Sequence, residues 1–263
     1  MREHVRSFVA AAAETLALAG PVFEFGSYQV EGQQSRGNLR PLFTGRGYLG
    51  CDLRPGPGVD RIEDLARLSL SDSVAGTVVC VDTLEHVLEA RRAVDEMIRV
   101  LAPGGVLLVA VPFAFHIHHH PHDYWRLTPA CVSELLAPLA ASLVGSQGDE
   151  SSPHTVYGIG CRAPVPAHFA GAVPRFLAAF EERLQLAAAA VPWSTRAKQM
   201  LRGWTASKGE SRRQREFFTA RFVVDVPPAT SAAGSEPASQ RAGAAGRSSA
   251  PEPPASGLRP HRR

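Results

Sequence analysis

The stretch VFEFGSYQVEGQ, Val22 to Gln33, decides how the rest of the chain is interpreted. It begins as a short apolar strand, carries an acid at Glu24 and turns at Gly26. A strand that ends in a glycine turn brings backbone N–H groups to the carboxyl edge of a sheet, where open α/β sheets bind their ligands. Taken alone, the stretch also fits an ordinary tight strand-to-helix turn, because Gly26 and Gly32 do not complete a G-x-G-x-x-G pattern.

The composition is that of a globular protein with a basic tail. The chain has 263 residues, of which 44% are hydrophobic, which is enough for one large domain or two small ones. Lys plus Arg number 28 and Asp plus Glu number 25. This excess lies in residues 226–263, which hold five Arg and two Glu, so the rest of the chain is balanced. The balance predicts no nucleic-acid footprint on the folded part.

The four cysteines favour a reduced protein. They are widely spaced and form no C-x-x-C pair: Cys51, Cys80, Cys131 and Cys161. We interpret them as small hydrophobes of a cytoplasmic protein. No apolar run approaches the roughly 18–20 residues of a membrane span. Residues 1–20 superficially resemble a signal peptide, but Glu3 and Glu14 interrupt them. A core-capping helix is therefore the preferred interpretation, and a signal sequence is the alternative.

Short apolar runs and connections alternate along residues 20–162. The strand-like runs are 22–26, 48–53, 77–81 and 106–111. A helix is predicted at 88–101, with an apolar stripe of Leu88, Val94, Met97, Ile98 and Leu101. This alternation is the doubly wound α/β pattern, and entirely apolar strands are typical of a mostly parallel sheet covered on both faces.

The second half of the chain predicts further helices and a disordered tail. A helix at 129–141 begins after a plausible cap at Thr128, and strands follow at 142–147, 155–162 and 216–226. Helices are predicted at 166–190 and 194–206, beside or over the carboxyl edge of the sheet. The predicted organisation is a domain over 1–165 with an N-terminal helix, a helical extension over 166–226 and a disordered tail over 227–263.

Two motifs carry a family resemblance. They are TVVCVDTLEH at 77–86 and RVLAPGGVLLVAV at 99–111. With the glycine turn at Gly26 and the acid that ends strand two, residues 20–162 resemble class I S-adenosylmethionine-dependent methyltransferases of the small-molecule, type 11-like kind. The resemblance implies a Rossmann-like methyltransferase fold with extra C-terminal helices, and S-adenosyl-L-methionine as the cofactor.

The resemblance also implies where the cofactor lies. Gly26 would let the backbone approach its methionine part, and Glu24 would order the glycine loop or meet the amino group. Asp52 would accept both ribose hydroxyls; a plain surface acid is the alternative. The other implied cofactor contacts are Ser27, Asp64, Leu65, Asp82, Leu84 and His86. Asp60 and Glu63 compete with Asp64 for the adenine position, and helix capping by Asp82 and a packed His86 are structural alternatives.

The opening loop departs from the family's E-x-G-x-G-x-G pattern. Tyr28 stands where the second glycine is expected. The spacing from Gly26 to Asp52 is also longer than the usual interval of about 20 residues. The loop is therefore expected to be longer and differently shaped, which bears on cofactor affinity rather than on the fold.

The loop PFAFHIHHHPHDYWR at 112–126 has the most unusual composition. It holds five histidines: His116, His118, His119, His120 and His122. His116, His122 and Asp123 are candidates for acid–base catalysis and substrate contact, because the loop follows strand four at the ligand edge. His116, His118 and Asp123 alternatively suit a divalent metal. A packed loop without chemistry is the third interpretation. We expect catalysis without a metal.

These observations predict a methyltransferase that acts on a small-molecule substrate, with O-methylation of a sugar or lipid-linked intermediate as the finer hypothesis. The alternatives are a catalytically silent binding module of the same fold and a metal-dependent enzyme that uses the His-rich loop. No nucleic-acid partner and no membrane span are expected, and the sequence assigns no oligomeric state.

Overall fold

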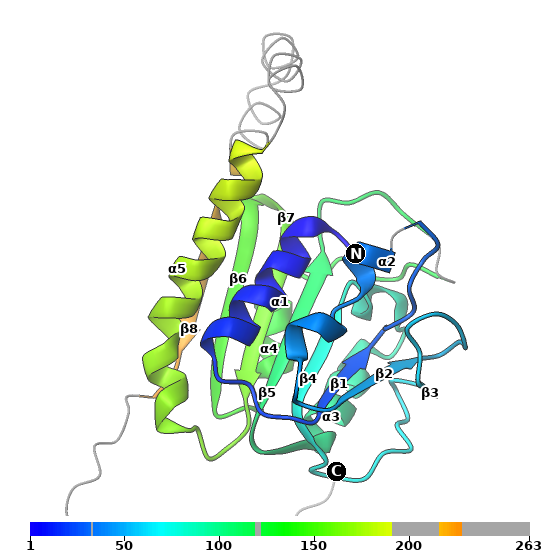
Figure 1. Cartoon of the computed structure of the whole chain (residues 1–263). Helices are drawn as coiled ribbons and strands as arrows, with labels where there is room; N and C mark the ends of the chain where they lie inside the picture. The colour runs from blue at the N-terminus through cyan, green and yellow to red at the C-terminus, as the bar shows by residue number, and fades with distance from the viewer. Residues whose placement is uncertain (33, 119–121, 191–215, 228–263) are drawn as a thin grey trace, which may run out of the picture. The chain divides into compact units, whose positions relative to one another are not determined.

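Eight strands pair into one sheet in the order β3-β2-β1-β4-β5-β7-β6-β8 (Figure 1). They are β1 (Val22–Phe25), β2 (Tyr48–Asp52), β3 (Arg61–Ile62), β4 (Ala75–Val81), β5 (Leu101–Pro112), β6 (Ala141–Asp149), β7 (Ser152–Cys161) and β8 (Ala220–Asp225). The first five are mutually parallel. β7 is antiparallel to β5 and β6, and β8 is antiparallel to β6. The predicted doubly wound, mostly parallel sheet is confirmed.

The computed structural model describes residues 1–32, 34–118, 122–190 and 216–227. Its helices are α1 (Glu3–Thr15), α2 (Gln34–Gly37), η1 (Arg40–Phe43), η2 (Leu84–His86), α3 (Ala90–Val100), α4 (Pro129–Leu136) and α5 (Ala167–Ala189). None of the helices in these ranges is long and apolar enough to cross a membrane. The predicted helix at 194–206 and residues 228–263 of the predicted tail lie outside these ranges.

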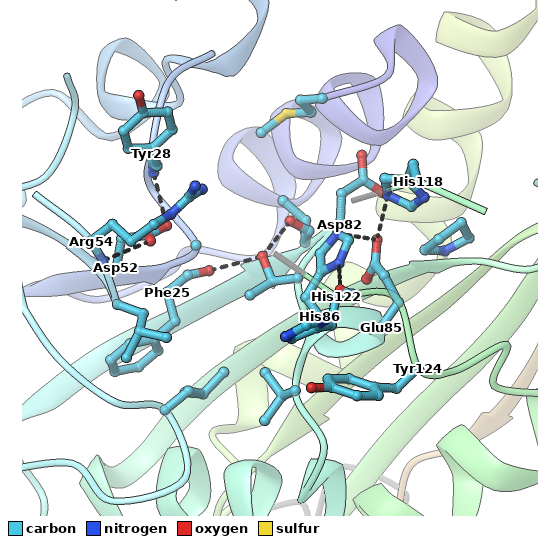
Figure 2. A pocket seen from close by; sticks show the side chains of 18 of the residues that line it. Phe25, Tyr28, Asp52, Arg54, Asp82, Glu85, His86, His118, His122 and Tyr124 are labelled. Atoms are coloured by element: carbon cyan, nitrogen blue, oxygen red, sulfur yellow. Dashed lines mark hydrogen bonds and ion pairs between the residues drawn. The ribbon is translucent and has the colours of Figure 1, made fainter. Parts of the chain in front are cut away.

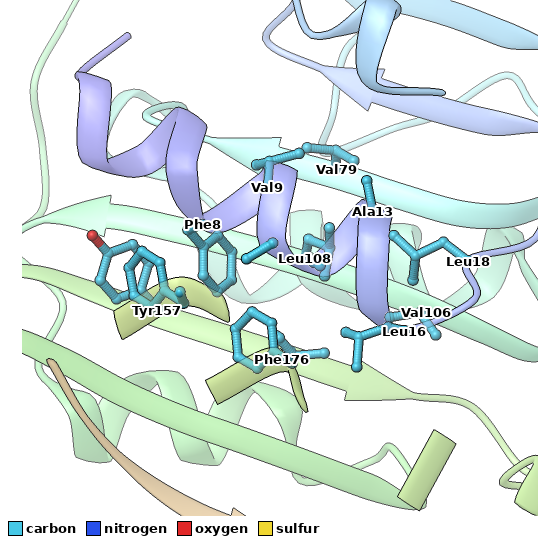
Figure 3. Packing of buried hydrophobic residues seen from close by; sticks show 14 of the residues in the cluster. Phe8, Val9, Ala13, Leu16, Leu18, Val79, Val106, Leu108, Tyr157 and Phe176 are labelled. Atoms are coloured by element: carbon cyan, nitrogen blue, oxygen red, sulfur yellow. The ribbon is translucent and has the colours of Figure 1, made fainter. Parts of the chain in front are cut away.

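Helices cover both faces of the sheet, and the central strands are apolar for that reason. Every residue of β1 and of β4 is buried. On one face the side chains of α3 and α4 pack under the strands. On the other, α1 and α5 share one core with β5, β6 and β7. Figure 3 shows this second core, where the rings of Phe8 and Tyr157 lie with their centroids 4.7 Å apart.

The position of α5 corrects our expectation for the C-terminal helices. We expected them beside or over the carboxyl edge of the sheet, but α5 packs along α1 on one face (Figure 1). Its buried side chains include Phe176 and Phe180, which contact Phe8 edge to face. β8 extends the same sheet. Residues 167–189 and 220–225 therefore share the core and the sheet of the first 165 residues, and the boundary at 165 stays a prediction.

Two helix predictions need smaller corrections. The predicted helix at 88–101 begins at Ala90, and Leu88, which we placed on its apolar stripe, is 62% exposed. The reason is that η2 takes up the residues after β4 and separates them from α3. The helix at 129–141 ends at Leu136, and its predicted cap is present, because Thr128 Oγ1 accepts a hydrogen bond from the backbone N–H of Cys131 at 3.1 Å.

All four cysteines are free thiols.

Candidate functional site

A cleft of about 780 Å³ opens over the carboxyl ends of β1, β2, β4 and β5 (Figure 2). In the sheet, β2 lies on one side of β1 and β4 lies on the other, so the strand order reverses at β1. The cleft lies at this point. Open α/β sheets bind ligands at such a point. The volume is in the range of small-molecule and cofactor sites.

One side of the cleft, which we call the Asp52 wall, consists of Tyr28, Asp52 and Arg54. Asp52 Oδ2 accepts the backbone N–H of Tyr28 at 3.2 Å, and its Oδ1 accepts that of Arg54 at 3.2 Å. The Arg54 guanidinium lies over the Tyr28 ring, 4.8 Å from its centroid. Tyr28 thus anchors the loop that replaced the expected glycine pattern, and the backbone fixes the carboxylate.

Gly26 is required by the packing at the end of β1. Its φ is +87°, and a Cβ there would lie 1.9 Å from Thr83 Oγ1. Thr83 in turn donates its hydroxyl to the carbonyl of Val81 at 2.9 Å. Any other residue at position 26 would therefore clash with the turn after β4 and adopt a strained backbone. This reason concerns the fit of two turns, and it is independent of the cofactor contact that we expected of Gly26.

The three acids that flank β3 differ in whether they line the cleft. Asp64 and Leu65 line the cleft, and Asp64 Oδ1 accepts the backbone N–H of Ala66 at 3.0 Å. Glu63 also lines the cleft but is buried and bonded to Ser69. Asp60, the third candidate for the adenine position, instead accepts the Gly50 N–H at 2.7 Å. Of the three acids, Asp64 is the exposed one at the cleft.

The N-terminus contributes to the lining of the cleft. Met1 and Arg2 line it, and the Arg2 guanidinium forms an ion pair with Asp82 at 2.5 Å. Arg2 Nη1 also donates to Thr155 Oγ1 at 2.8 Å. Asp82 has a φ of +50°, in the left-handed region, directly after β4. Its predicted cofactor role stays a prediction, and the structure gives it a partner in Arg2.

The opposite side, which we call the Glu85 wall, consists of Glu85, His86 and His118. Glu85 is 1% exposed, and burial raises the pKa of its carboxyl well above the ordinary value. The Nε2 atoms of His86 and His118 lie 3.8 and 3.9 Å from Glu85 Oε1. Burial also lowers the pKa of His86. All three residues line the cleft.

The His-rich loop places two of its three predicted catalytic groups at the cleft. His116 and His122 line the cleft and are exposed. Asp123 does not line it and requires a correction, because its side chain is 1% exposed and pairs with Arg126. Its Oδ2 also lies 3.0 Å from His118 Nδ1. The hydrogen bonds from Arg126 hold the pKa of Asp123 well below its usual range, so this carboxylate fixes the loop.

Three residues that the sequence analysis assigned to cofactor binding do not line the cleft in the described part of the chain. Glu24 is buried in β1 and accepts a hydrogen bond from the Tyr48 hydroxyl. Burial raises the pKa of Glu24 to about 7. Ser27 is buried, and its hydroxyl has no hydrogen-bond partner there. Leu84 is 1% exposed and belongs to the core beneath the cleft. Their cofactor roles stay predictions.

Sequence reasoning missed three residues of the cleft: Arg2, Tyr28 as an anchor, and Glu85. Glu85 stands inside the DTLEH motif, and the available signal was an acid between the apolar residues Leu84 and Val87. For Arg2 there was no signal, because its pairing with Asp82 joins positions 80 residues apart.

The residues present fit S-adenosylmethionine. Each carboxylate oxygen has two acceptor sites, and each oxygen of Asp52 accepts one backbone N–H, so each retains one site for a ribose hydroxyl. Leu53 and Leu65 provide apolar surface in the same cleft. The donor set and the volume therefore suit a nucleoside with a diol.

Comparisons with known proteins support the expected resemblance. Residues 52–109 match a family described as a methyltransferase domain. The chain is 33% identical over 140 residues to a probable S-adenosylmethionine-dependent methyltransferase from Mycolicibacterium smegmatis, which is 52% of this chain and 51% of the relative. The chain thus spans about half the length of the curated relative it matches. The resemblance to class I methyltransferases is confirmed, and the comparisons support S-adenosylmethionine as the cofactor.

Two solved structures to which the chain is similar carry methyltransferase names. One is a possible histamine N-methyltransferase from Thermotoga maritima, at 16% identity and a TM-score of 0.42, covering 60% of this chain and 91% of that one. Another is 1,6-didemethyltoxoflavin-N1-methyltransferase from Burkholderia thailandensis, with S-adenosylhomocysteine bound, at 17% identity and a TM-score of 0.43. The latter comparison covers 61% of this chain and 79% of that one.

Proposed function

We propose that this protein transfers a methyl group from S-adenosylmethionine to a small acceptor. The observation that carries the proposal is Asp52, which ends β2 with one acceptor site left on each oxygen, inside a cleft at the strand-order reversal. When bound, the cofactor supplies a methyl group on a positively charged sulfonium, which leaves as a neutral thioether. The sequence matches named above support the same reaction class.

In this proposal the chain's residues bind, orient and exclude water. Asp52 accepts the ribose hydroxyls, and Asp64 and Leu65, which line the same cleft, receive the adenine. Met1 and Arg2 also line the cleft, and their side chains take up space that water would otherwise fill. Positioning of this kind supplies a large part of the acceleration in bimolecular group transfer.

Transfer to a hydroxyl is the finer proposal, with a sugar or lipid-linked intermediate as the acceptor. A hydroxyl acceptor must lose a proton as the new O–CH3 bond forms, and His116 and His122 lie exposed on the cleft. Histidine is the side chain that most often acts as a general base in enzymes. These two histidines are therefore the proposed bases.

The reaction is tested with methyl-labelled S-adenosylmethionine and fractionated small-molecule extracts that include sugars and lipid-linked sugars. We expect label in a small product and release of S-adenosylhomocysteine. His116→Ala and His122→Ala should lower turnover more than cofactor affinity. His168→Ala, an exposed histidine on α5, is the matched control and should change neither. If all three variants showed the turnover of the wild type, His116 and His122 would no longer be the proposed bases.

A further inference from the structure

Glu85 is a buried carboxylate that its protein surroundings leave unsatisfied. It lies on η2, directly after β4, and is 1% exposed. Neither of its oxygens accepts a hydrogen bond from the described residues. The two nearby guanidinium groups are engaged elsewhere, because Arg2 pairs with Asp82 and Arg126 pairs with Asp123. A buried carboxylate in this state costs free energy unless it takes up a proton or a cation meets it.

Two imidazoles face this carboxylate. His86 Nε2 lies 3.8 Å and His118 Nε2 lies 3.9 Å from Glu85 Oε1 (Figure 2). The two rings meet edge to face with centroids 4.7 Å apart. One ligand atom from each of the three residues lies within 4.8 Å of the others. Two nitrogens and a carboxylate oxygen thus converge from η2 and the His-rich loop.

The opposite nitrogen of each ring is held by an oxygen. His86 Nδ1 lies 2.5 Å from the carbonyl oxygen of His122. His118 Nδ1 lies 3.0 Å from Asp123 Oδ2 and 3.3 Å from the carbonyl oxygen of His116. An Nδ1–H donor fixes the tautomer in which Nε2 carries the lone pair. Metal-binding histidines are oriented by such contacts, including the carboxylate–histidine pair seen at His118.

The backbone preforms this arrangement. The carbonyl of Glu85 accepts the backbone N–H of Tyr124 at 2.7 Å and that of Trp125 at 3.3 Å. The Trp125 indole N–H also donates to the Val87 carbonyl at 3.0 Å. These bonds fasten the end of the His-rich loop to η2, so the three side chains are brought together by the fold itself.

We propose that Glu85, His86 and His118 bind a divalent transition-metal ion such as Zn²⁺. Two imidazoles and one carboxylate are a suitable ligand set for zinc or iron, and such three-ligand sites leave positions open. Bonds of about 2.0–2.2 Å place tetrahedral ligand atoms roughly 3.4 Å apart. The separations of 3.8 and 3.9 Å between Glu85 Oε1 and the two Nε2 atoms therefore need to shorten by only about 0.5 Å around an ion. This ligand set differs from the His116, His118 and Asp123 set suggested by the sequence, because Asp123 is occupied by Arg126.

The open positions of the ion face the cleft, since all three ligands line it. A metal there suits an acceptor oxygen, whose hydroxyl loses its proton more readily when coordinated. This consequence rests on the proposed methyl transfer, whereas the metal site itself does not. The acceptor class it favours is an alcohol, a diol or a carbohydrate.

Calorimetric titration of the EDTA-treated full-length protein with Zn²⁺ tests the site. We expect one equivalent to bind, with a 10- to 100-fold or greater loss of affinity in Glu85→Gln and His118→Ala. Asp123→Asn should weaken binding by about 10-fold or more, because it releases His118. His116→Ala is the matched control on the same loop and should bind Zn²⁺ as wild type does. Circular dichroism confirms that each variant is folded.

The outcomes of two titrations separate this inference from the proposed function. No stoichiometric Zn²⁺ binding, or equal binding by wild type and Glu85→Gln, overturns the metal site. Loss of binding in His116→Ala with retention in Glu85→Gln assigns the metal to the other ligand set and also overturns it. Titration of the metal-free protein with S-adenosylmethionine runs in parallel. Cofactor binding without Zn²⁺ binding leaves the proposed function standing, and Zn²⁺ binding without cofactor binding leaves only the metal site.

Discussion

The Asp52 wall and the Glu85 wall face each other across one cleft, but different parts of the chain hold them. Asp52 accepts two backbone N–H groups, from Tyr28 and Arg54. Glu85 accepts no backbone N–H from the described residues. It is surrounded by the His-rich loop, which is held by side-chain ion pairs such as that between Arg126 and Asp123. The carboxylate at the Asp52 wall is ready to accept hydroxyls, whereas the one at the Glu85 wall calls for a cation.

This difference between the two walls has a consequence for the stability of the protein. Side-chain substitutions around the Glu85 wall should disturb the structure strongly, because the buried Asp123 carboxylate beside it is held by side-chain ion pairs. Substitutions around the Asp52 wall should leave the fold almost unchanged and act on binding. Three variants or conditions test this contrast on stability before ligand binding is measured.

The largest effect is expected for Arg126→Ala. It leaves the Asp123 carboxylate, 1% exposed, without its guanidinium partner. Removing one partner of a buried pair costs about 3–5 kcal/mol of unfolding free energy. Urea denaturation measures the loss. Arg91→Ala, which removes an exposed pair with Asp95 on α3, is the control and should cost less than about 1 kcal/mol. Similar values for the two variants would remove the special role of Asp123.

Acid should have the next largest effect, through the buried His4 and the half-buried His154. Burial lowers the pKa of His4 to about 3 and that of His154 to about 4, from an ordinary 6.5. The unfolded chain therefore binds more protons below pH 6.5, so the unfolding free energy falls as the pH falls from 6.5 toward 4. At pH 4.5 the loss from His4 is on the order of 2 kcal/mol.

Urea denaturation at pH 7 and pH 4.5 measures this loss. His4→Gln should show a smaller difference between the two pH values than wild type. The exposed His168→Gln should behave as wild type does. An equal pH dependence in His4→Gln and wild type would mean that His4 takes up its proton without unfolding.

The smallest effect is expected for Arg54→Ala at the Asp52 wall. The variant removes the exposed Arg54 guanidinium from its contact with the half-buried Tyr28 ring but keeps the backbone N–H that Asp52 accepts. Cation–π contacts at such sites contribute about 0.5–1 kcal/mol. Thermal melting should therefore shift only slightly. A loss comparable with that of Arg126→Ala would show that the Asp52 wall also depends on side chains.

The two walls also differ in how far the sequence predicted them. The apolar runs of β1, β2 and β4 and the acid that closes β2 are local signals, so the sheet and the position of Asp52 followed from the pattern. The Glu85 wall is formed by contacts between η2 and residues 32 or more positions away. No local pattern contains such contacts, so Glu85 was overlooked and Asp123 was assigned to catalysis.

The placement of helices shows the same limit. The helical periodicity after residue 166 predicted α5 but not the face on which it packs, because that depends on the aromatic core shared with Phe8. Leu88 fitted the apolar stripe of the next helix, yet η2 ends at His86 and leaves Leu88 exposed. Period and composition predict elements well, whereas tertiary contacts decide their neighbours.

Calorimetric titration with S-adenosylmethionine tests the central claim most directly. Wild type should bind, and Asp52→Ala should bind roughly 10- to 150-fold more weakly, because hydrogen bonds from hydroxyls to a carboxylate contribute about 1.5–3 kcal/mol. Asp95→Ala, an exposed acid on α3, should bind as wild type does. No binding by wild type at millimolar cofactor would contradict the methyltransferase proposal, and equal binding by Asp52→Ala would contradict the placement of the ribose at the Asp52 wall.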